Sequence, residues 1–189
     1  GDCLIIDPGC YDEREEQALK AYITNHHLHP RHLLNTHCHL DHVFGNKFVH
    51  DTWKLELNLH ANEKIVLDYA PEAGKRWNLP FTNYSGPLHY IRAGDTISLG
   101  TDELTVIEAP GHSPGHVCFY NAAQQFLIGG DVLFRGSIGR TDLPGGNHSQ
   151  LLQSIRTQLF TLPDEVRVYP GHGTSTTIGY EKRSNPFFK

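Results

Sequence analysis

The segment from Thr36 to His42 reads T-H-C-H-L-D-H and places three histidines and one aspartate within six residues. Imidazole and carboxylate groups bind divalent ions such as zinc, iron and manganese. If the chain is extended here, side chains two residues apart point to the same side, so His37, His39 and Asp41 converge. A helix that begins near Asp41 would turn His42 towards the same centre. The segment therefore predicts a metal site.

Three further segments carry the same kinds of side chain and follow apolar runs. The segment 110–116 reads P-G-H-S-P-G-H and includes His112, and its form recurs at 170–173, P-G-H-G, with His172. Between them, an apolar run ends in Gly-Gly-Asp131. Loops at strand ends are where a rigid sheet aims functional residues. We therefore expect all four segments to supply ligands to one centre.

The ligand set exceeds what one tetrahedral ion can use, and the two oxygens of Asp131 can bridge two cations. Two ions about 3.5–4 Å apart share a water and lower its pKa towards about 7, giving a hydroxide at neutral pH. Such a metal-bridging hydroxide predicts hydrolysis of an ester-type carbonyl, with Asp41 and Asp131 as catalytic residues. Two divalent ions are expected, with zinc the first expectation and iron or manganese also open. The expected ligands are His37, His39, Asp41, His42, His112, Asp131 and His172.

The first half of the chain has the strand, helix, strand order of a βαβ unit. Apolar runs predict strands at Cys3–Asp7, His32–Thr36 and Leu57–His60. Helical spacing of apolar residues predicts helices over Asp12–His27, Val43–Trp53 and from Glu63 towards Trp77. The stretch Leu79–Leu88 is predicted to be a loop, with a lid or substrate-side position.

The second half predicts an antiparallel meander of short strands. The strands are expected at Thr96–Leu99, Leu104–Ala109, Val117–Tyr120 and Phe126–Ile128, followed by a helix over Gln150–Leu162 and a strand at Val166–Tyr169. The whole predicts an α/β (α+β) fold in which two mixed sheets form a sandwich with helices outside. One domain over residues 1–189 is expected, with its first strand pairing with a strand that would precede Gly1.

Composition narrows the classes of protein. Sixteen basic and 21 acidic residues give a net charge of −5 without a basic stripe, so nucleic acid is not an expected partner. No apolar stretch has the length of a membrane span, and the four cysteines form no C-x-x-C pair. We therefore expect a cytoplasmic protein that acts on a small molecule, with no prediction of its oligomeric state.

The H-x-H-x-D-H motif at 37–42 and the later ligand positions resemble the metallo-β-lactamase superfamily and, within it, the glyoxalase II (hydroxyacylglutathione hydrolase) group. The resemblance covers nearly the whole chain and implies the αββα four-layer sandwich of that superfamily. It implies one ion held by His37, His39 and His112, another by Asp41, His42 and His172, and both by Asp131. Asp131 differs from the β-lactamases, which have a cysteine there or lack a bridging carboxylate.

The resemblance implies hydrolysis of a thioester such as S-D-lactoylglutathione. The chain ends soon after the last ligand, without the helical domain that contacts glutathione in larger members, as in shorter bacterial members. Where the larger members have Lys followed by Phe and Tyr, this chain has Arg140-Thr141-Asp142. Arg140 is suited to hold a substrate carboxylate, but pairing with Asp142 instead is an equal alternative. Arg135 and Tyr84 are further candidates for substrate contact.

Other functions stay open. The segment Arg135–Asp142 also resembles persulfide dioxygenases, which use mononuclear iron held by the equivalents of His37, His112 and Asp131. A lactonase is a third enzymatic alternative. The alternative outside catalysis is a metal-binding interaction module whose site is plugged.

Three residues close to the ligands have structural interpretations. Cys38 should face away from the metal ions, so it is expected to be a packed residue and not a nucleophile. His116 is expected to support the site or its strand and not to be an eighth ligand. Asp7, at the end of the first strand, is expected to hydrogen-bond a ligand histidine and fix its tautomer.

Overall fold

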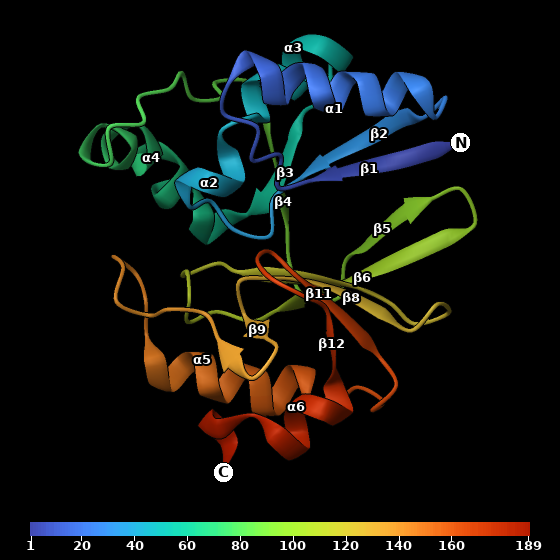
Figure 1. Ribbon diagram of the computed structural model, residues 1–189, viewed down its shortest axis with the longest axis vertical. Helices are drawn as coiled ribbons and strands as arrows, with labels where there is room; N and C mark the ends of the chain where they lie inside the picture. Colours follow the sequence, from blue (N-terminus) through green and yellow to red (C-terminus); the bar gives the residue numbers. More distant parts are fainter. The chain divides into compact units, whose positions relative to one another are not determined.

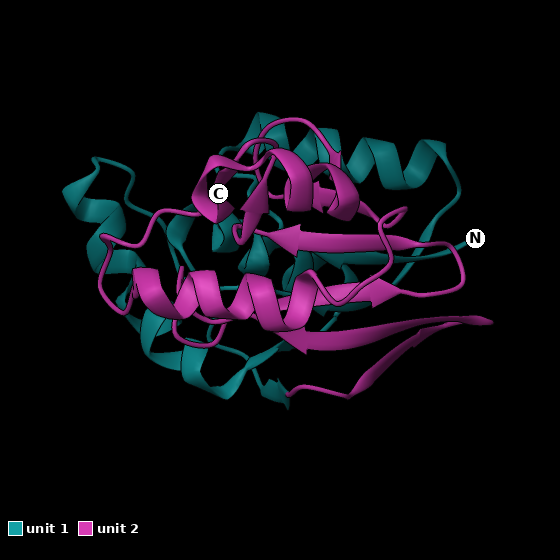
Figure 2. Cartoon of the chain, turned by 90° about the horizontal axis from the view of Figure 1, so that it is seen from below, with its two compact units in different colours: residues 1–91 teal, residues 92–189 magenta.

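The computed structural model describes residues 1–189, and they form two compact units, Gly1–Ile91 and Arg92–Lys189 (Figure 2). Each unit has its own sheet and its own cluster of buried apolar residues. The prediction of a single domain over 1–189 stays a prediction. No helix of either unit is long and apolar enough to span a bilayer.

The first unit is built on a parallel sheet in the order β1-β2-β3-β4 (Figure 1). Its strands are β1 (Asp2–Ile6), β2 (His29–Leu34), β3 (Leu57–His60) and β4 (Leu88–Ile91). Its main helices are α1 (Glu13–Asn25), α2 (Leu40–Val43), α3 (Asn46–Trp53) and α4 (Lys64–Arg76). Because α1 connects the parallel neighbours β1 and β2, the predicted βαβ unit is confirmed.

Apolar residues of the sheet and the helices make the core of the first unit. Leu33 and Leu57 from the strands and Val49 from α3 have no exposed surface. In Figure 1, α1 and α3 lie over one face of this sheet. Helix α1 begins where the Asp12 side chain accepts a hydrogen bond from the Glu15 amide at 2.9 Å, an N-cap that satisfies a free helix donor. This packing holds the C-terminal end of β2, where the predicted ligands begin.

The predicted helix Val43–Trp53 is wrong in its first part. The structure has α2 and α3 with a break at Phe44–Gly45. The Gly45 amide donates to Pro8 O at 2.7 Å, and a Cβ on Gly45 would lie 2.3 Å from Cys10 Sγ. The chain is thus interrupted where the turn after β1 packs against it. The consequence is that α2 is one turn that carries Asp41 and His42.

The second unit contains a six-stranded sheet in the order β12-β11-β8-β7-β6-β5. Its strands are β5 (Thr96–Leu99), β6 (Asp102–Glu108), β7 (Val117–Asn121), β8 (Phe126–Gly130), β11 (Arg167–Pro170) and β12 (Thr176–Thr177). Neighbours from β5 to β8 are antiparallel, which confirms the predicted meander. Strand β11 then joins β8 in parallel. The ends of β8 and β11 therefore lie side by side.

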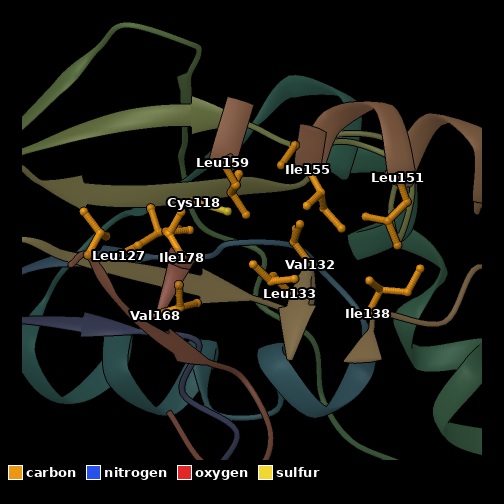
Figure 3. Packing of buried hydrophobic residues seen from close by; sticks show 12 residues of the cluster. Cys118, Leu127, Val132, Leu133, Ile138, Leu151, Ile155, Leu159, Val168 and Ile178 are labelled. Carbon is orange, nitrogen blue, oxygen red and sulfur yellow. The ribbon is translucent and has the colours of Figure 1, made fainter. Parts of the chain in front are cut away.

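Helices cover one face of this second sheet (Figure 1). They are α5 (His148–Ser154), which continues as a π-helix over Ile155–Leu159, and α6 (Ile178–Ser184). Figure 3 shows Leu151, Ile155 and Leu159 in the buried cluster that also contains the strand residues Leu127 and Val168. The apolar stripe predicted for Gln150–Leu162 is therefore the packed side of this helix.

Several short elements were not predicted. They include β4, the hairpin of β9 (Leu133–Phe134) and β10 (Ser137–Ile138), β12, α6 and a final 3₁₀ helix, Pro186–Phe188. The stretch 79–87 is irregular, as expected, but it is tied to its own unit. Asn83 Nδ2 donates to Leu67 O at 2.7 Å, and Phe81 and Tyr84 pack on the apolar core. These contacts argue against a lid.

Candidate metal centre

The predicted ligands of the first unit leave the end of β2 and enter α2. His37 is fully buried, His39 is half-buried at the N-cap of α2, and His42 is buried within that helix. The Asp41 side chain is 48% exposed. The ring centroids of His37 and His42 lie 4.0 Å apart, and those of His37 and His39 lie 4.8 Å apart. The structure thus brings the three imidazoles together, as the alternating spacing and the helix start predict.

Asp7, which follows β1, forms hydrogen bonds with the chain between Asn35 and His42. Its Oδ1 accepts from the Thr36 amide at 2.7 Å and from Asn35 Nδ2 at 3.2 Å. Its Oδ2 accepts from Thr36 Oγ1 at 2.6 Å and lies 3.1 Å from His42 Nδ1. The predicted hydrogen bond between Asp7 and one of the predicted ligand histidines is confirmed, and the histidine is His42, whose Nδ1–H donates to Asp7.

These contacts select the tautomers of two histidines. A carboxylate only accepts, so His42 donates its Nδ1–H to Asp7, which leaves Nε2 with its lone pair. The Thr36 hydroxyl donates its only proton to Asp7. His37 Nδ1 lies 3.1 Å from Thr36 Oγ1, and because that hydroxyl has no second proton, His37 must be the donor in this contact. His37 Nε2 is then also a lone-pair donor, the form that a metal ion binds.

Asp7→Asn is expected to weaken binding of divalent metal about 10- to 100-fold, the usual cost of losing a partner that orients a ligand. An asparagine has one acceptor oxygen in place of two, and it tolerates the left-handed backbone of Asp7, whose φ is 50°. Competition with a chromophoric chelator measures the change. The matched control is Asp2→Asn, which removes an exposed aspartate from the strand that precedes Asp7. Equal affinity of the two variants would contradict the role of Asp7.

Gly9 packs against the main chain of Asp41. A Cβ on Gly9 would lie 2.4 Å from the carbonyl oxygen of Asp41. Real side chains do not approach this closely, so any larger residue at position 9 displaces the first turn of α2. The turn Pro8-Gly9 thereby sets the main chain of one predicted carboxylate ligand.

In the second unit, the predicted ligands are on three loops at one end of the sheet. His112 follows β6, Asp131 follows β8 and His172 follows β11. Asp131 Oδ2 lies 3.7 Å from His112 Nε2 and 3.6 Å from His172 Nε2. Side chains of His112 and Asp131 are 3% and 11% exposed, whereas that of His172 is 59% exposed. One carboxylate oxygen therefore lies beside the Nε2 atoms of two histidines from different loops.

Two of these residues are held by hydrogen bonds in which one partner is a main-chain group. His112 Nδ1 lies 2.7 Å from Arg140 O, which can only accept, so His112 also carries its proton on Nδ1 and presents Nε2. His116 Nε2 accepts from the Asp131 amide at 3.0 Å. His116 therefore supports Asp131, as predicted. Arg140 O and His116 thus hold His112 and Asp131 in the second unit, as Asp7 holds His42 in the first.

A second glycine lies behind Asp131. A Cβ on Gly139 would be 1.9 Å from Asp131 O and 3.1 Å from His112 Nδ1. The chain at Gly139 therefore passes directly against both of these predicted ligand residues. The Gly139 amide also donates to Val132 O at 3.1 Å, which ties the two segments together.

Cys38 lies between two predicted ligands but is fully buried in the apolar core of the first unit. Burial, with the nearby Glu63 and Asp7 carboxylates, raises the pKa of the Cys38 thiol well above its usual value. A thiol in this state is a poor nucleophile, which agrees with its predicted packing role.

Cys38→Ala is therefore expected to keep kcat/KM within about threefold of wild type and to lower stability by about 1 kcal/mol. In the native wild-type protein, a thiol reagent such as iodoacetamide should leave Cys38 and the equally buried Cys118 unmodified. Half-buried Cys3 and Cys10 provide the internal comparison. Mass spectrometry after digestion reads the modified positions. Loss of turnover in Cys38→Ala with retained metal would contradict this interpretation.

The predicted substrate contacts have other partners. Arg140 is exposed and makes a bidentate pair with Asp142 at 2.7 and 2.8 Å, and this pairing lowers the pKa of the Asp142 carboxyl to about 2. Arg135 is exposed, with its guanidinium 4.8 Å from the Tyr180 ring centroid. Tyr84 is 6% exposed, and its hydroxyl donates to Pro87 O and accepts from Leu57 N. Tyr84 is thus a buried packing residue, whereas Arg135 and Arg140 are exposed at the surface.

Sequence reasoning missed Glu63. This carboxylate is fully buried, and its Oε2 accepts from the Cys38 amide at 2.7 Å. An acidic residue at the start of a helix is common, because it interacts favourably with the helix dipole. No feature of the sequence distinguishes Glu63 from such a surface residue.

The donor set fits divalent metal ions. His37, His42 and His112 each direct an Nδ1–H to an oxygen acceptor and keep Nε2 for coordination. Carboxylates of Asp41 and Asp131 lie within 4 Å of the ring nitrogens of their neighbours. Neutral imidazoles with carboxylates are the ligands of zinc, iron and manganese.

A family model described as the metallo-β-lactamase superfamily matches residues 1–172, which includes every predicted ligand. The chain belongs to the metallo-β-lactamase superfamily. The sequence prediction of this family is confirmed. Membership makes the chain a metallo-hydrolase that binds divalent metal, and the close group of Asp7, His37 and His42 in the first unit agrees with that.

Curated relatives in this superfamily match almost the whole chain. The chain is 39% identical over 186 residues to the "Probable metallo-hydrolase YqgX" of Bacillus subtilis, covering 98% of this chain and 86% of the relative. It is 38% identical over 188 residues to the "Hydroxyacylglutathione hydrolase GloC" of Haemophilus influenzae, covering 98% and 87%.

Solved structures of the superfamily confirm the predicted α/β class and metallo-β-lactamase fold. The structure of BLEG-1, titled a B3 metallo-β-lactamase, has a TM-score of 0.90 at 38% identity, covering 99% of this chain and 88% of that one. TTHA1623, solved in a di-iron-bound form, has a TM-score of 0.86 at 40% identity, covering 96% and 87%.

Proposed function

We propose that this metallo-hydrolase is a thioesterase of the glyoxalase II type that cleaves a hydroxyacylglutathione. The observation that carries the proposal is the position of Asp131 Oδ2, within 3.7 Å of Nε2 atoms from both His112 and His172. A carboxylate placed between two imidazoles suits a bridging ligand of a dinuclear centre. The 38% identity to a protein named hydroxyacylglutathione hydrolase supports the substrate class.

The proposal takes the ligands of both units as one set for two ions, with zinc the first expectation. His37, His39 and His112 would hold one ion, Asp41, His42 and His172 the other, and Asp131 both. Two bound cations would polarise the acyl carbonyl and lower the pKa of a water towards about 7, which supplies a nucleophile at neutral pH.

The chain's own residues orient the reactants. The carboxylates of Asp41 and Asp131 accept hydrogen bonds from the attacking water, which is the catalytic role that we propose for them. Arg140 and Arg135 are the proposed contacts for the carboxylates of the glutathione part. Arg140 is held by Asp142, so a substrate carboxylate would exchange with Asp142 for the same bidentate site. A small-molecule substrate and a cytoplasmic location remain predictions.

The experiment is thiol release from S-D-lactoylglutathione by protein loaded separately with zinc, iron(II) or manganese. The released thiol is detected with a chromogenic disulfide. A neutral thioester with the same acyl group is the matched control, because it lacks the carboxylates that the arginines would bind. Preference for the glutathione thioester supports the proposal. Absence of thiol release with all three metals defeats it.

A second candidate is a persulfide dioxygenase with one iron. The resemblance of Arg135–Asp142 to that group favours it. Oxygen consumption with glutathione persulfide, together with a content of one iron per chain, would support this candidate over the hydrolase. A lactone and a β-lactam belong in the same substrate panel, since a lactonase is a further alternative and BLEG-1 is titled a β-lactamase. Bound metal without turnover of any substrate would favour an interaction module.

A further inference from the structure

Glu63 is a fully buried carboxylate in the 3₁₀ helix Ala61–Glu63, directly before α4. Removing an ionisable group from water is costly unless hydrogen bonds replace the lost hydration. The Glu63 Oε2 atom accepts from the Cys38 amide at 2.7 Å. The carboxylate is therefore used to hold the main chain of the ligand segment.

The segment that Glu63 holds has no regular secondary structure of its own. Residues 35–39 lie between the end of β2 and the start of α2. Two of its amides are bound by carboxylates from elsewhere in the first unit. Thr36 N donates to Asp7 Oδ1 at 2.7 Å, and Cys38 N donates to Glu63 Oε2. The main-chain amides of the two residues that flank His37 are thus each bound by an acidic side chain.

We propose that Glu63 is a positioning residue for metal binding, which fixes the Cys38 amide and thereby the directions of the His37 and His39 imidazoles. Glu63 itself touches neither metal nor substrate in this proposal. The inference rests on the proposed function only through the assignment of His37 and His39 as ligands. Without the acceptor, the segment gains conformational freedom, and that freedom is lost again when a metal ion binds.

Two conservative variants separate the hydrogen bond from the charge. Glu63→Gln keeps the length and an acceptor oxygen but removes the charge. Glu63→Asp keeps the charge but withdraws the acceptor by one methylene. If the bond to the Cys38 amide is what matters, Glu63→Asp should weaken zinc binding and Glu63→Gln should not.

The experiment measures zinc affinity of the purified full chain by competition with a chromophoric chelator. Glu63→Asp and Glu63→Ala are expected to bind zinc about 10- to 100-fold more weakly than wild type. Glu63→Gln is expected to stay within about threefold, because an amide oxygen accepts the same bond. The reverse order, with Glu63→Gln weak and Glu63→Asp normal, would overturn the proposal.

A matched control distinguishes positioning from general loss of stability. Glu181 is also fully buried and accepts from Gly136 N, Thr176 Oγ1 and Asn185 Nδ2, all within the second unit. Glu181→Gln and Glu181→Asp should change the thermal midpoint without the tenfold loss of zinc affinity. Equal loss of affinity in the Glu181 and Glu63 pairs would show that the effect is not local and would overturn the proposal.

The variant His37→Ala shows whether a negative result concerns the role of Glu63 or the assignment of His37 as a metal ligand. If His37→Ala loses zinc and Glu63→Asp does not, Glu63 has no positioning role, although the ligand assignment stands. If His37→Ala binds zinc as wild type does, the ligand assignment itself is wrong, and the role of Glu63 falls with it.

Discussion

Asp131→Asn is expected to lower kcat/KM for the thioester by about 1,000-fold, equivalent to about 4 kcal/mol of transition-state stabilisation. The physical reason is that an amide has one oxygen and no charge, so it cannot bridge two cations. The substitution is nearly isosteric, and the main-chain N–H of residue 131 would still donate to His116. Steady-state kinetics and elemental analysis of the same preparation measure both turnover and metal content.

The control for Asp131→Asn is Asp164→Asn, which removes an exposed carboxylate in the same unit. Asp164 pairs with Lys182 and Arg183 at the surface, where ion pairs contribute little to stability. Its activity and metal content should equal those of wild type. Two ions per chain with full activity in Asp131→Asn would exclude the bridging role.

Removal of the metal ions with a chelator is expected to abolish hydrolysis and to lower stability by about 3 kcal/mol for each ion, if free metal was present at about 100 times its Kd. For a chain of this length, the loss of each ion corresponds to a fall of about 6–12 °C in the thermal midpoint. Differential scanning calorimetry before and after dialysis checks the shift, and added zinc should restore both properties. Unchanged activity in the metal-free protein would contradict a metallo-hydrolase of the proposed kind.

The two ions should leave at different rates. Asp41 and His172 have side chains that are 48% and 59% exposed, whereas His37 is fully buried and His112 is 3% exposed. A chelator therefore reaches the ion proposed for Asp41, His42 and His172 first. Release followed with a metal indicator should be biphasic, with one equivalent per phase. A single phase that releases both equivalents would be inconsistent with this assignment.

Some strands could be predicted with their bounds because their hydrophobic runs stop abruptly at polar residues. Leu57–His60 and Thr96–Leu99 are strands with the predicted bounds. Strand β2 lies at His29–Leu34, earlier than the predicted His32–Thr36, because the Asn35 and Thr36 amides bond to Asn58 O and Asp7 Oδ1. The error is at an element boundary, where tertiary hydrogen bonds compete with the strand.

The break between α2 and α3 could not be predicted from periodicity. It depends on a hydrogen bond from Gly45 to Pro8 and on close contact with Cys10, both distant in sequence. The same holds for the short hairpin of β9 and β10, whose two-residue strands carry no periodic signal. Local patterns report only local preferences, and these features are set by long-range packing.

The candidate metal site also has features that the sequence predicts and features that it does not. Residue types and spacing indicated the histidines and aspartates, since metal chemistry restricts which side chains can serve. The groups that orient them are mostly main-chain atoms or ordinary side chains, such as Arg140 O and the Glu63 carboxylate. Such partners have no distinctive sequence signal. The Asp7 contact could be anticipated, because Asp7 follows a strand next to the ligand segment, and so could the supporting role of His116, which lies close to a predicted ligand in the sequence.

The contacts of Gly9 with Asp41 O and of Gly139 with Asp131 O make these two positions attractive for protein engineering. A methyl group there would push the main chain and leave every ligand atom chemically intact. Alanine at either glycine would therefore be a way to retune coordination geometry, and with it metal preference, without redesigning any coordinating side chain.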